Sequence, residues 1–294
     1  MDARMGLGMS ASDAAPDTIV LIHGLWLTAR SWEHWSGRYE SLGYGVLAPN
    51  WPGMESEVEA VNADPTRIAP LTVEQIVDRY ESIVLELERP PIIIGHSLGG
   101  TFTQILLDRG LGVAGVGVAS VTVERVRDIP LTTIKVASPA ISPFTQGGLV
   151  PLTPKEFHYA FANTLGREES DALHARYAVP APAGLVREHA FASFRRETRS
   201  TPEVHRERRA PLLFIGFGED HVMPPTLLRH DQEVSDDASP ITEFVEFPGR
   251  PHFPGAPGWE EVADHALTWA VKHASRSTAS ADTVADDGVE GGSS

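Results

Sequence analysis

The chain has 294 residues, a formal net charge of −16 and no cysteine. This length accommodates one large α/β domain, and 41% hydrophobic residues is ordinary for a soluble globular protein. The acidic surplus argues against nucleic acid or anionic lipid as a partner, because binding either one requires an excess of Lys and Arg. The lack of cysteine excludes disulfides, a cysteine nucleophile and thiolate metal sites.

Both ends of the chain have compositions that predict flexibility. Residues 1–16 are small, polar and rich in Gly and Ala, and residues 275–294 are of low complexity. We therefore predict one ordered domain over residues 17–274. No apolar run matches a signal-peptide core or the roughly 20 residues of a membrane span, so we expect a cytoplasmic protein with no membrane partner. The sequence gives no indication of the oligomeric state.

Apolar, β-branched runs alternate with helical patterns along the chain. The runs predict buried strands at 18–22, 45–48, 92–94, 113–118, 212–217 and 244–247. The patterns between and after them predict helices at 31–42, 73–88, 101–107 and 259–273. This alternation indicates an α/β fold, a mostly parallel sheet of about six strands flanked by helices. Thr72 and Gln75 form a capping box for the second helix, and the polar residues 54–70 are predicted to be loop.

The alternation breaks between about residues 121 and 209. This segment has a helical character punctuated by prolines, and its aromatic centre is Phe157-His158-Tyr159-Ala160-Phe161. Because it lies between two strands of the expected parallel sheet, we predict a helical cap inserted into the domain. The arginines between Arg195 and Arg209 alternate with glutamates, a pattern that favours a solvated, internally paired helical face over an anion-binding site.

The segment Gly95-His96-Ser97-Leu98-Gly99 has the G-x-S-x-G form and stands between a predicted strand and a predicted helix. A nucleophile at such an elbow is held in a strained turn, and small residues at positions 95 and 99 allow the strand and the helix to approach closely. Both flanking elements are present, which favours a nucleophile elbow over an ordinary glycine-rich turn. We predict that Ser97 is a nucleophile.

Serine is a poor nucleophile at neutral pH and needs a base that a third group orients. His252 follows the last predicted strand and is the candidate base. Asp220 follows the preceding strand and is the candidate acid, in the chain order that this fold produces. Glu219 is the less favoured acid, and His221 is interpreted as an ordinary loop histidine. His265 and His273 are interpreted as surface or packing residues of the last helix.

An acyl-transfer enzyme also needs two donors for the oxyanion that develops on the substrate carbonyl. The backbone N–H of Leu98, next to Ser97, is one candidate. The other is expected in the loop after the first strand, at Leu25 or alternatively at Trp26. No His and carboxylate cluster has metal-ligand spacing, so neither a metal nor a cofactor is predicted.

Four motifs, the His23-Gly24 loop, the elbow, the acid loop at 218–225 and the loop of His252, together resemble the α/β-hydrolase superfamily over about residues 18–273. The resemblance is nearest to small single-domain esterase, lactonase and perhydrolase-like members with a helical cap. There are two departures from the usual pattern. Only 17 residues precede the first strand, so the usual N-terminal hairpin is expected to be absent or reduced. The polar loop after Trp51 is longer than usual and could border the mouth of the active site.

The resemblance and a serine at the elbow predict a carboxylic ester or lactone hydrolase that acts through an acyl-enzyme. An apolar or aryl acyl substrate is expected from residues of a possible pocket, namely Trp26, Phe157, His158, Tyr159 and Phe161. The aromatic residues could equally serve only to pack the cap on the core. The alternatives are a cofactor-free dioxygenase, suggested by Pro49-Asn50-Trp51, a perhydrolase, or a non-catalytic receptor on the same fold. The dioxygenase is disfavoured because no Asp follows the strand before the cap.

Overall fold

The structure, a computed structural model, describes residues 16–55, 57–120, 131–141, 148–192, 209–229 and 241–286. Within these ranges, six parallel strands form one sheet in the order β2-β1-β3-β4-β7-β8. The strands are β1 (Thr18–Ile22), β2 (Gly45–Leu47), β3 (Ile92–His96), β4 (Ala114–Val118), β7 (Leu212–Phe217) and β8 (Thr242–Phe247). The predicted fold class is therefore confirmed, and no described strand precedes β1.

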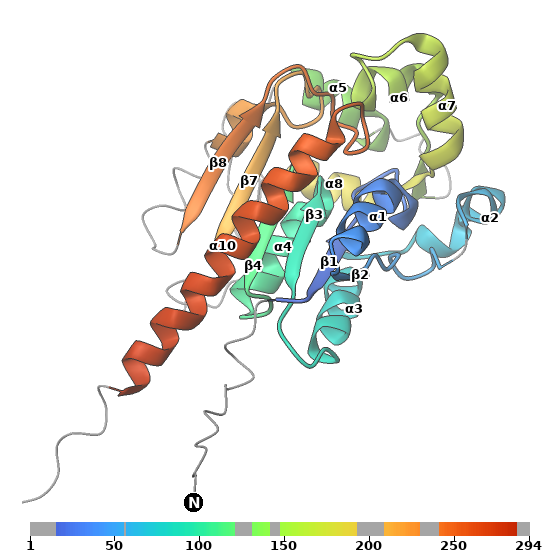
Figure 1. The fold of residues 1–294 in the computed structure, drawn as a ribbon. Coiled ribbons are helices and arrows are strands. Elements are labelled where there is room, and N and C mark those ends of the chain that lie inside the picture. The colour runs from blue at the N-terminus through green and yellow to red at the C-terminus, as the bar shows by residue number, and fades with distance from the viewer. Residues whose placement is uncertain are drawn as a thin grey trace, which may run out of the picture.

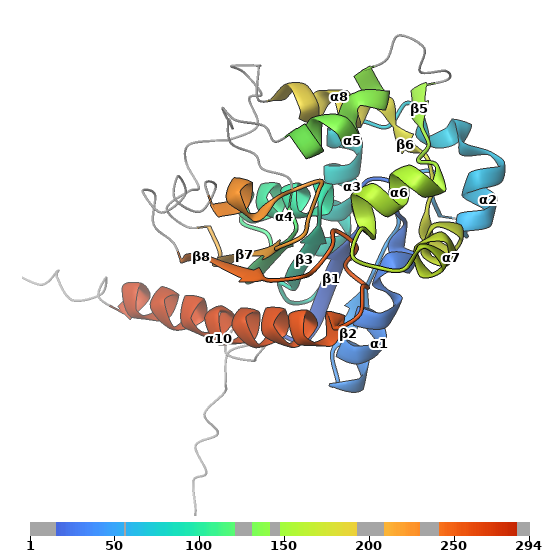
Figure 2. The ribbon, with the colours of Figure 1, turned by 90° about the horizontal axis from the view of Figure 1, so that it is seen from above.

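The sheet is covered by helices on both faces, which explains the continuous apolar runs in its strands. Figure 2 shows α1 (Glu33–Ser41) and α10 (Trp259–Asp286) on one face of the sheet, and α3 (Val73–Leu85) and α4 (Leu98–Asp108) on the other. Successive residues of β1 alternate between two separate cores. Ile19 and Leu21 pack in the cluster that contains Trp32 and Trp269, whereas Val20 packs in the cluster of the opposite face.

Between β4 and β7 the chain forms the predicted helical insertion. Its described elements are α5 (Leu131–Ile141), β5 (Leu149–Val150), α6 (Pro154–Phe161), α7 (Arg167–Tyr177), β6 (Ala181–Pro182) and α8 (Ala183–Ala192). Figure 1 shows α5, α6 and α7 grouped beyond the ends toward which the strand arrows point. In a parallel sheet these carboxyl ends carry the functional loops, so this segment, here called the cap, lies over them. The Arg-rich stretch falls outside the described residues, apart from Arg209.

The segment 54–70 contains more structure than the sequence predicted. It forms α2 (Val58–Ala63) and the 3-10 helix η2 (Pro65–Ile68). Another 3-10 helix, η1 (Ala29–Trp32), lies between β1 and α1. Prediction of a loop was wrong because the polar composition masked an apolar pair: Val58 and Val61 share one helical face and are buried. The capping box of α3 is present as predicted, with both reciprocal hydrogen bonds.

The last helix is longer than predicted. It was expected to end near residue 273, whereas α10 continues to Asp286 because residues 274–286 contain several alanines and neither Gly nor Pro. Residues 1–15 and 287–294 lie outside the described residues, so the flexibility expected at the two ends stays a prediction. In the described part of the chain, no helix is both long enough and apolar enough to cross a membrane.

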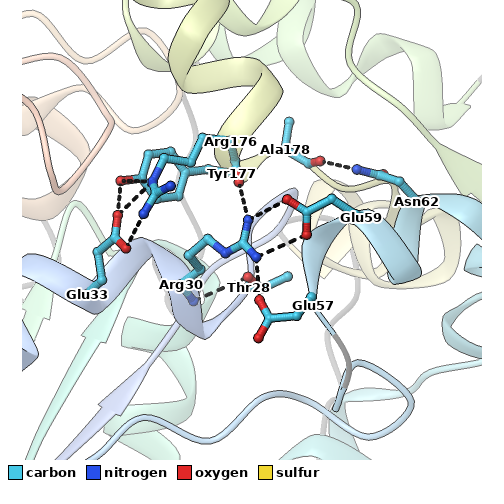
Figure 3. A network of polar contacts seen from close by, with 9 residues as sticks. All are labelled: Thr28, Arg30, Glu33, Glu57, Glu59, Asn62, Arg176, Tyr177 and Ala178. Atoms are coloured by element: carbon cyan, nitrogen blue, oxygen red, sulfur yellow. Dashed lines mark hydrogen bonds and ion pairs between the residues drawn. The ribbon is translucent and has the colours of Figure 1, made fainter.

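A network of charged side chains ties the cap to the N-terminal half of the domain (Figure 3). Arg30 in η1 donates to Glu59 of α2 at 2.8 Å and 3.0 Å, to Glu57, and to the carbonyl of Arg176 at the end of α7. Arg176 in turn pairs with Glu33 of α1 at 2.6 Å. The hydrogen bonds that Arg30 donates to Glu59 and Glu57 raise the pKa of Arg30, so this guanidinium stays charged. Arg30 thus joins three segments that are remote in sequence.

Replacing Arg30 with Met should lower the Tm by a few degrees, because the variant keeps the apolar stem and loses every contact of the guanidinium. The difference from wild type should shrink in roughly 1 M salt, where the Debye length falls to about 3 Å. Thermal unfolding at low and high salt measures both effects. The matched control is Arg229→Met, which removes a more exposed guanidinium that pairs with Glu246 at 3.2 Å and lies over the Phe244 ring. Equal losses in both variants would contradict a special role for Arg30.

Candidate active site

Ser97 lies at the turn between β3 and α4, where the elbow was predicted. Its backbone φ of 54° falls in the region that favours glycine and that serine rarely adopts. The Ser97 N–H donates to the Val118 carbonyl of β4 at 2.9 Å, and the Ser97 carbonyl accepts the Gly100 N–H at 2.9 Å. Hydrogen bonds on both sides of the residue therefore maintain this strained conformation.

The two glycines of the motif are required by close backbone contacts. A Cβ atom on Gly95 would lie 2.1 Å from the Gly99 carbonyl oxygen, and a Cβ atom on Gly99 would lie 2.2 Å from the Ile22 carbonyl oxygen. Real Cβ atoms do not approach backbone atoms that closely. The helix after Ser97 thus packs directly against both β3 and the end of β1, as the sequence pattern predicts.

The predicted base and acid lie in hydrogen-bond contact. His252 Nδ1 is 2.6 Å from Asp220 Oδ2, and both side chains are completely buried. The other carboxylate oxygen, Oδ1, accepts the N–H groups of Val222 at 2.7 Å and Met223 at 2.8 Å. A carboxylate only accepts, so Nδ1 carries the proton and Nε2 has a free lone pair. Nε2 is buried and has no hydrogen-bond partner among the described residues, Ser97 Oγ included, so its lone pair is available to accept a proton.

The less favoured candidates take other roles. Glu219 is exposed, and its backbone N–H donates to the Arg250 carbonyl at 3.0 Å. His265 is exposed and packs edge-on against Phe247, whereas His273 is buried and stacks on Trp269 at 4.4 Å. Of the weighed acids, only Asp220 contacts His252 among the described residues.

The loop after β1 brings its predicted oxyanion donors next to the elbow. A Cβ atom on Gly24 would lie 2.7 Å from Ser97 Cβ, so this loop touches the elbow directly. Among the described residues, no acceptor binds the N–H of Leu25, Trp26 or Leu98. Trp26 has a φ of 62°, and its carbonyl accepts the Val179 N–H from the cap at 2.9 Å. The backbone donors beside Ser97 are thus unengaged, which leaves both the Leu25 and the Trp26 alternatives open.

Aromatic side chains of the cap cover His252. The ring of Phe161 meets the His252 ring edge-on at 4.9 Å, and Phe157 stacks on Phe161 at 5.0 Å. Trp26 meets Phe161 at 6.2 Å. The Phe161 carbonyl also accepts the N–H of Phe253, the residue after His252, at 3.0 Å. Helix α6 therefore contributes both an apolar surface and a backbone anchor to the loop of His252.

The same helix contacts the loop of Asp220. His221 Nδ1 donates to the Tyr159 carbonyl at 2.8 Å, and Asn163 Nδ2 donates to the Glu219 carbonyl at 3.0 Å. His221, which was interpreted as an ordinary loop histidine, thus joins the acid loop to the cap. The Tyr159 ring packs on the His221 ring at 4.6 Å, not on His252. Of the remaining predicted pocket residues, His158 is half-buried and its Nδ1 has no partner among the described residues.

Sequence reasoning did not single out two buried histidines beside the elbow. His23 Nδ1 donates to the Gly24 carbonyl at 3.0 Å, and its Nε2 accepts the Trp51 N–H at 3.3 Å. His96 precedes Ser97, and its Nε2 lies 2.9 Å from the His252 carbonyl oxygen. The signal for His96 was its place inside the elbow motif, but its partner lies 156 residues further along the chain. No metal-binding group of three or more His, Asp or Glu residues occurs in the described ranges.

The model of the alpha/beta hydrolase family matches residues 19–265, which is most of the chain. No curated protein matches the sequence.

Solved structures of the same fold match nearly the whole chain. The monoacylglycerol lipase of Paleococcus ferrophilus is 21% identical, with a TM-score of 0.60 and coverage of 88% of this chain and 96% of its own. An extracellular alpha/beta-hydrolase from a Paenibacillus species is 19% identical, with a TM-score of 0.64 and coverage of 87% and 99%. A pyrethroid hydrolase from Sphingobium faniae is 18% identical, with a TM-score of 0.62 and coverage of 86% and 96%. At these identities the likeness establishes the fold.

The buried histidines should make the protein sensitive to mild acid. Burial lowers the pKa of His23 to about 4, below its ordinary value of 6.5, and burial also lowers the pKa of His96. The unfolded chain, in which both side chains are exposed, then binds more protons than the folded chain. The free energy of unfolding therefore falls as the pH drops from about 6.5 toward 4, by about 3 kcal/mol for His23 alone.

Urea unfolding at about pH 7 and about pH 5 measures this loss as a pH slope. In His23→Gln the slope of the unfolding free energy against pH should be smaller by about 0.7 proton, because the amide does not titrate. Identical slopes in the wild type and the variant would contradict the assignment of the acid sensitivity to His23.

Proposed function

Because the chain belongs to the alpha/beta hydrolase family, we propose that it is a serine-dependent carboxylic ester hydrolase. It cleaves an ester or a lactone through an acyl-enzyme on Ser97. The observation that carries this proposal is the buried hydrogen bond of 2.6 Å between His252 and Asp220, in a loop that His96 attaches to the elbow. The lipase and the pyrethroid hydrolase among the structural neighbours add support for a hydrolase.

The proposed reaction begins with attack of Ser97 Oγ on the carbonyl carbon of the substrate. His252 Nε2 takes the hydroxyl proton, and the Asp220 carboxylate stabilises the resulting imidazolium. The tetrahedral intermediate then breaks its bond to the alkoxy oxygen, which receives the proton from His252. An ester releases its alcohol in this step, whereas a lactone ring opens. Water next attacks the acyl-enzyme with His252 again as base, which releases the acid and restores Ser97. The reaction needs no cofactor.

The proposed oxyanion donors are the backbone N–H groups of Leu98 and of Leu25, with Trp26 as the alternative for the second. Leu98 opens helix α4, so its N–H also lies at the positive end of the helix dipole. A preorganised donor of this kind contributes typically about 100-fold or more to turnover. The strained elbow and the contact of Gly24 with Ser97 support this assignment, because they bring both backbone segments to the nucleophile.

An apolar or aryl acyl group is the proposed substrate class. Phe161 covers His252, and Phe157 and Trp26 pack against Phe161, so the immediate surroundings of the proposed base on this side are aromatic. A charged acyl group in contact with this surface would lose its hydration without gaining a partner. A dioxygenase is less well supported, because His252 pairs with Asp220, which follows β7. A cytoplasmic location stays a prediction.

Turnover of p-nitrophenyl esters tests the proposed nucleophile. We expect the wild type to hydrolyse p-nitrophenyl butyrate or benzoate, and Ser97→Ala to lose at least about 10⁴-fold in kcat. Labelling by a fluorophosphonate should likewise disappear in the variant. The matched control is Ser170→Ala in α7, which removes another buried serine hydroxyl and should leave turnover unchanged. A wild type that neither turns over nor becomes labelled would overturn the hydrolase and favour a binding function.

Substitution of the neighbouring carboxylates tests the proposed acid. Asp220→Asn should lower kcat by about 10⁴-fold, because an amide cannot stabilise the imidazolium and favours the wrong tautomer of His252. Glu219→Gln should change kcat little, because that side chain is exposed. The same ester assay measures both variants, and circular dichroism checks that each is folded. Comparable losses in the two variants would refute the specific role of Asp220.

A further inference from the structure

His96 occupies the variable position of the elbow motif, yet the proposed mechanism gives it no task. The side chain is fully buried at the end of β3, and its Nε2 atom lies 2.9 Å from the backbone carbonyl oxygen of His252. The two imidazole rings are 4.7 Å apart between centroids. His96 therefore contacts the loop of the proposed base both through a hydrogen bond and through its ring.

The hydrogen bond defines the protonation of the His96 ring. A carbonyl oxygen only accepts, so Nε2 must carry a proton. The other ring nitrogen, Nδ1, is buried and has no partner among the described residues, and it lies against Gly24. Burial, and next the nearby His252, lower the pKa of His96 well below its ordinary value. The ring is therefore a neutral donor whose single N–H points at the loop of His252.

This contact joins the nucleophile and the base through one residue. His96 is bonded covalently to Ser97, and its ring holds the carbonyl of His252. The imidazole of His252 is held separately by Asp220, and the next residue of the loop, Phe253, is held by the cap. Among these anchors, the His96 hydrogen bond is the one that relates the loop directly to the elbow. Its loss would let the base drift from Ser97 while the contact with Asp220 persists.

The chemistry of the position favours a neutral donor over a charged one. Lysine or arginine could reach the carbonyl, but would bring a permanent positive charge next to a ring that must itself become positive. The described ionisable groups around His96 are His252, 4.7 Å away between ring centroids, and His23 across the Gly24 loop. A neutral donor can hydrogen-bond the His252 carbonyl without placing a positive charge beside the His252 ring.

We propose that His96 is a positioning residue that sets the distance between Ser97 and His252 by hydrogen-bonding the backbone of the His252 loop. This proposal rests on the proposed function, since it concerns the same site. It predicts that the donor matters and that the imidazole itself can be replaced by another neutral donor of similar reach.

The test compares His96→Leu, which removes the donor, with His96→Gln, whose side-chain amide keeps one. The rate of Ser97 labelling by a fluorophosphonate and the kcat for p-nitrophenyl butyrate should fall between about 10-fold and 100-fold in His96→Leu, with KM little changed. His96→Gln should recover to within about threefold of the wild type. The matched control is His273→Leu, which removes another buried imidazole from α10 and should keep the wild-type rate. Equal rates in His96→Leu and His96→Gln, or a wild-type rate in a folded His96→Leu, would overturn the proposal.

A second readout does not depend on turnover. The NMR resonance of the His252 Nδ1 proton reports the contact with Asp220, and its exchange with water reports how firmly the loop is held. Exchange should be faster in His96→Leu than in the wild type and near the wild-type rate in His96→Gln. If the wild type has no esterase activity, the proposed function fails, and this exchange comparison still decides the role of His96. Unchanged exchange in all three proteins would refute it.

Discussion

The close packing of α4 against β3 and β1 is the constraint on which the rest of the site depends. Gly99 touches the end of β1 and Gly95 touches Gly99, so neither position has room for a side chain. This contact forces the chain through the strained turn at Ser97 and brings the His23-Gly24 loop against it. The proposed nucleophile and the backbone donors beside it are therefore brought together by one packing contact between backbone segments.

The cap covers the proposed site and also hydrogen-bonds the loops that carry His252 and Asp220. Helix α6 contacts the loop of His252 through the Phe161 carbonyl and the loop of Asp220 through the Tyr159 carbonyl, and Asn163, which follows the helix, also contacts the loop of Asp220. The far side of the cap is held by the network around Arg30. A segment of this kind that swung away as a rigid lid would break its contacts with the loops of Asp220 and His252, the proposed acid and base. Changes of sequence in α6 are thus expected to alter alignment and substrate preference together.

Local patterns in the sequence were sufficient to predict the strands of the sheet and the capping box at Thr72. They also sufficed to place Ser97, His252 and Asp220 just after the ends of strands. These features depend on residues within a few positions of one another. The contacts of His96 and Tyr159 could not be predicted, because each is made with a partner from a remote segment: the carbonyl of His252 and the ring of His221. Helix α2 was missed for a related reason, since its two buried valines gain stability only against the rest of the core.

Among the buried ionisable side chains beside the elbow, Asp220 supplies a negative charge, and His23 and His96 supply none. Asp220 is a buried carboxylate whose oxygens accept two backbone N–H groups and the His252 ring. The other buried imidazoles beside it, His23 and His96, are kept uncharged by burial. An imidazolium that forms at His252 then finds one opposite charge in direct contact and no positive charge from these neighbours to oppose it. Two neutral histidines can therefore supply hydrogen bonds to the loops of the site without adding a positive charge beside His252.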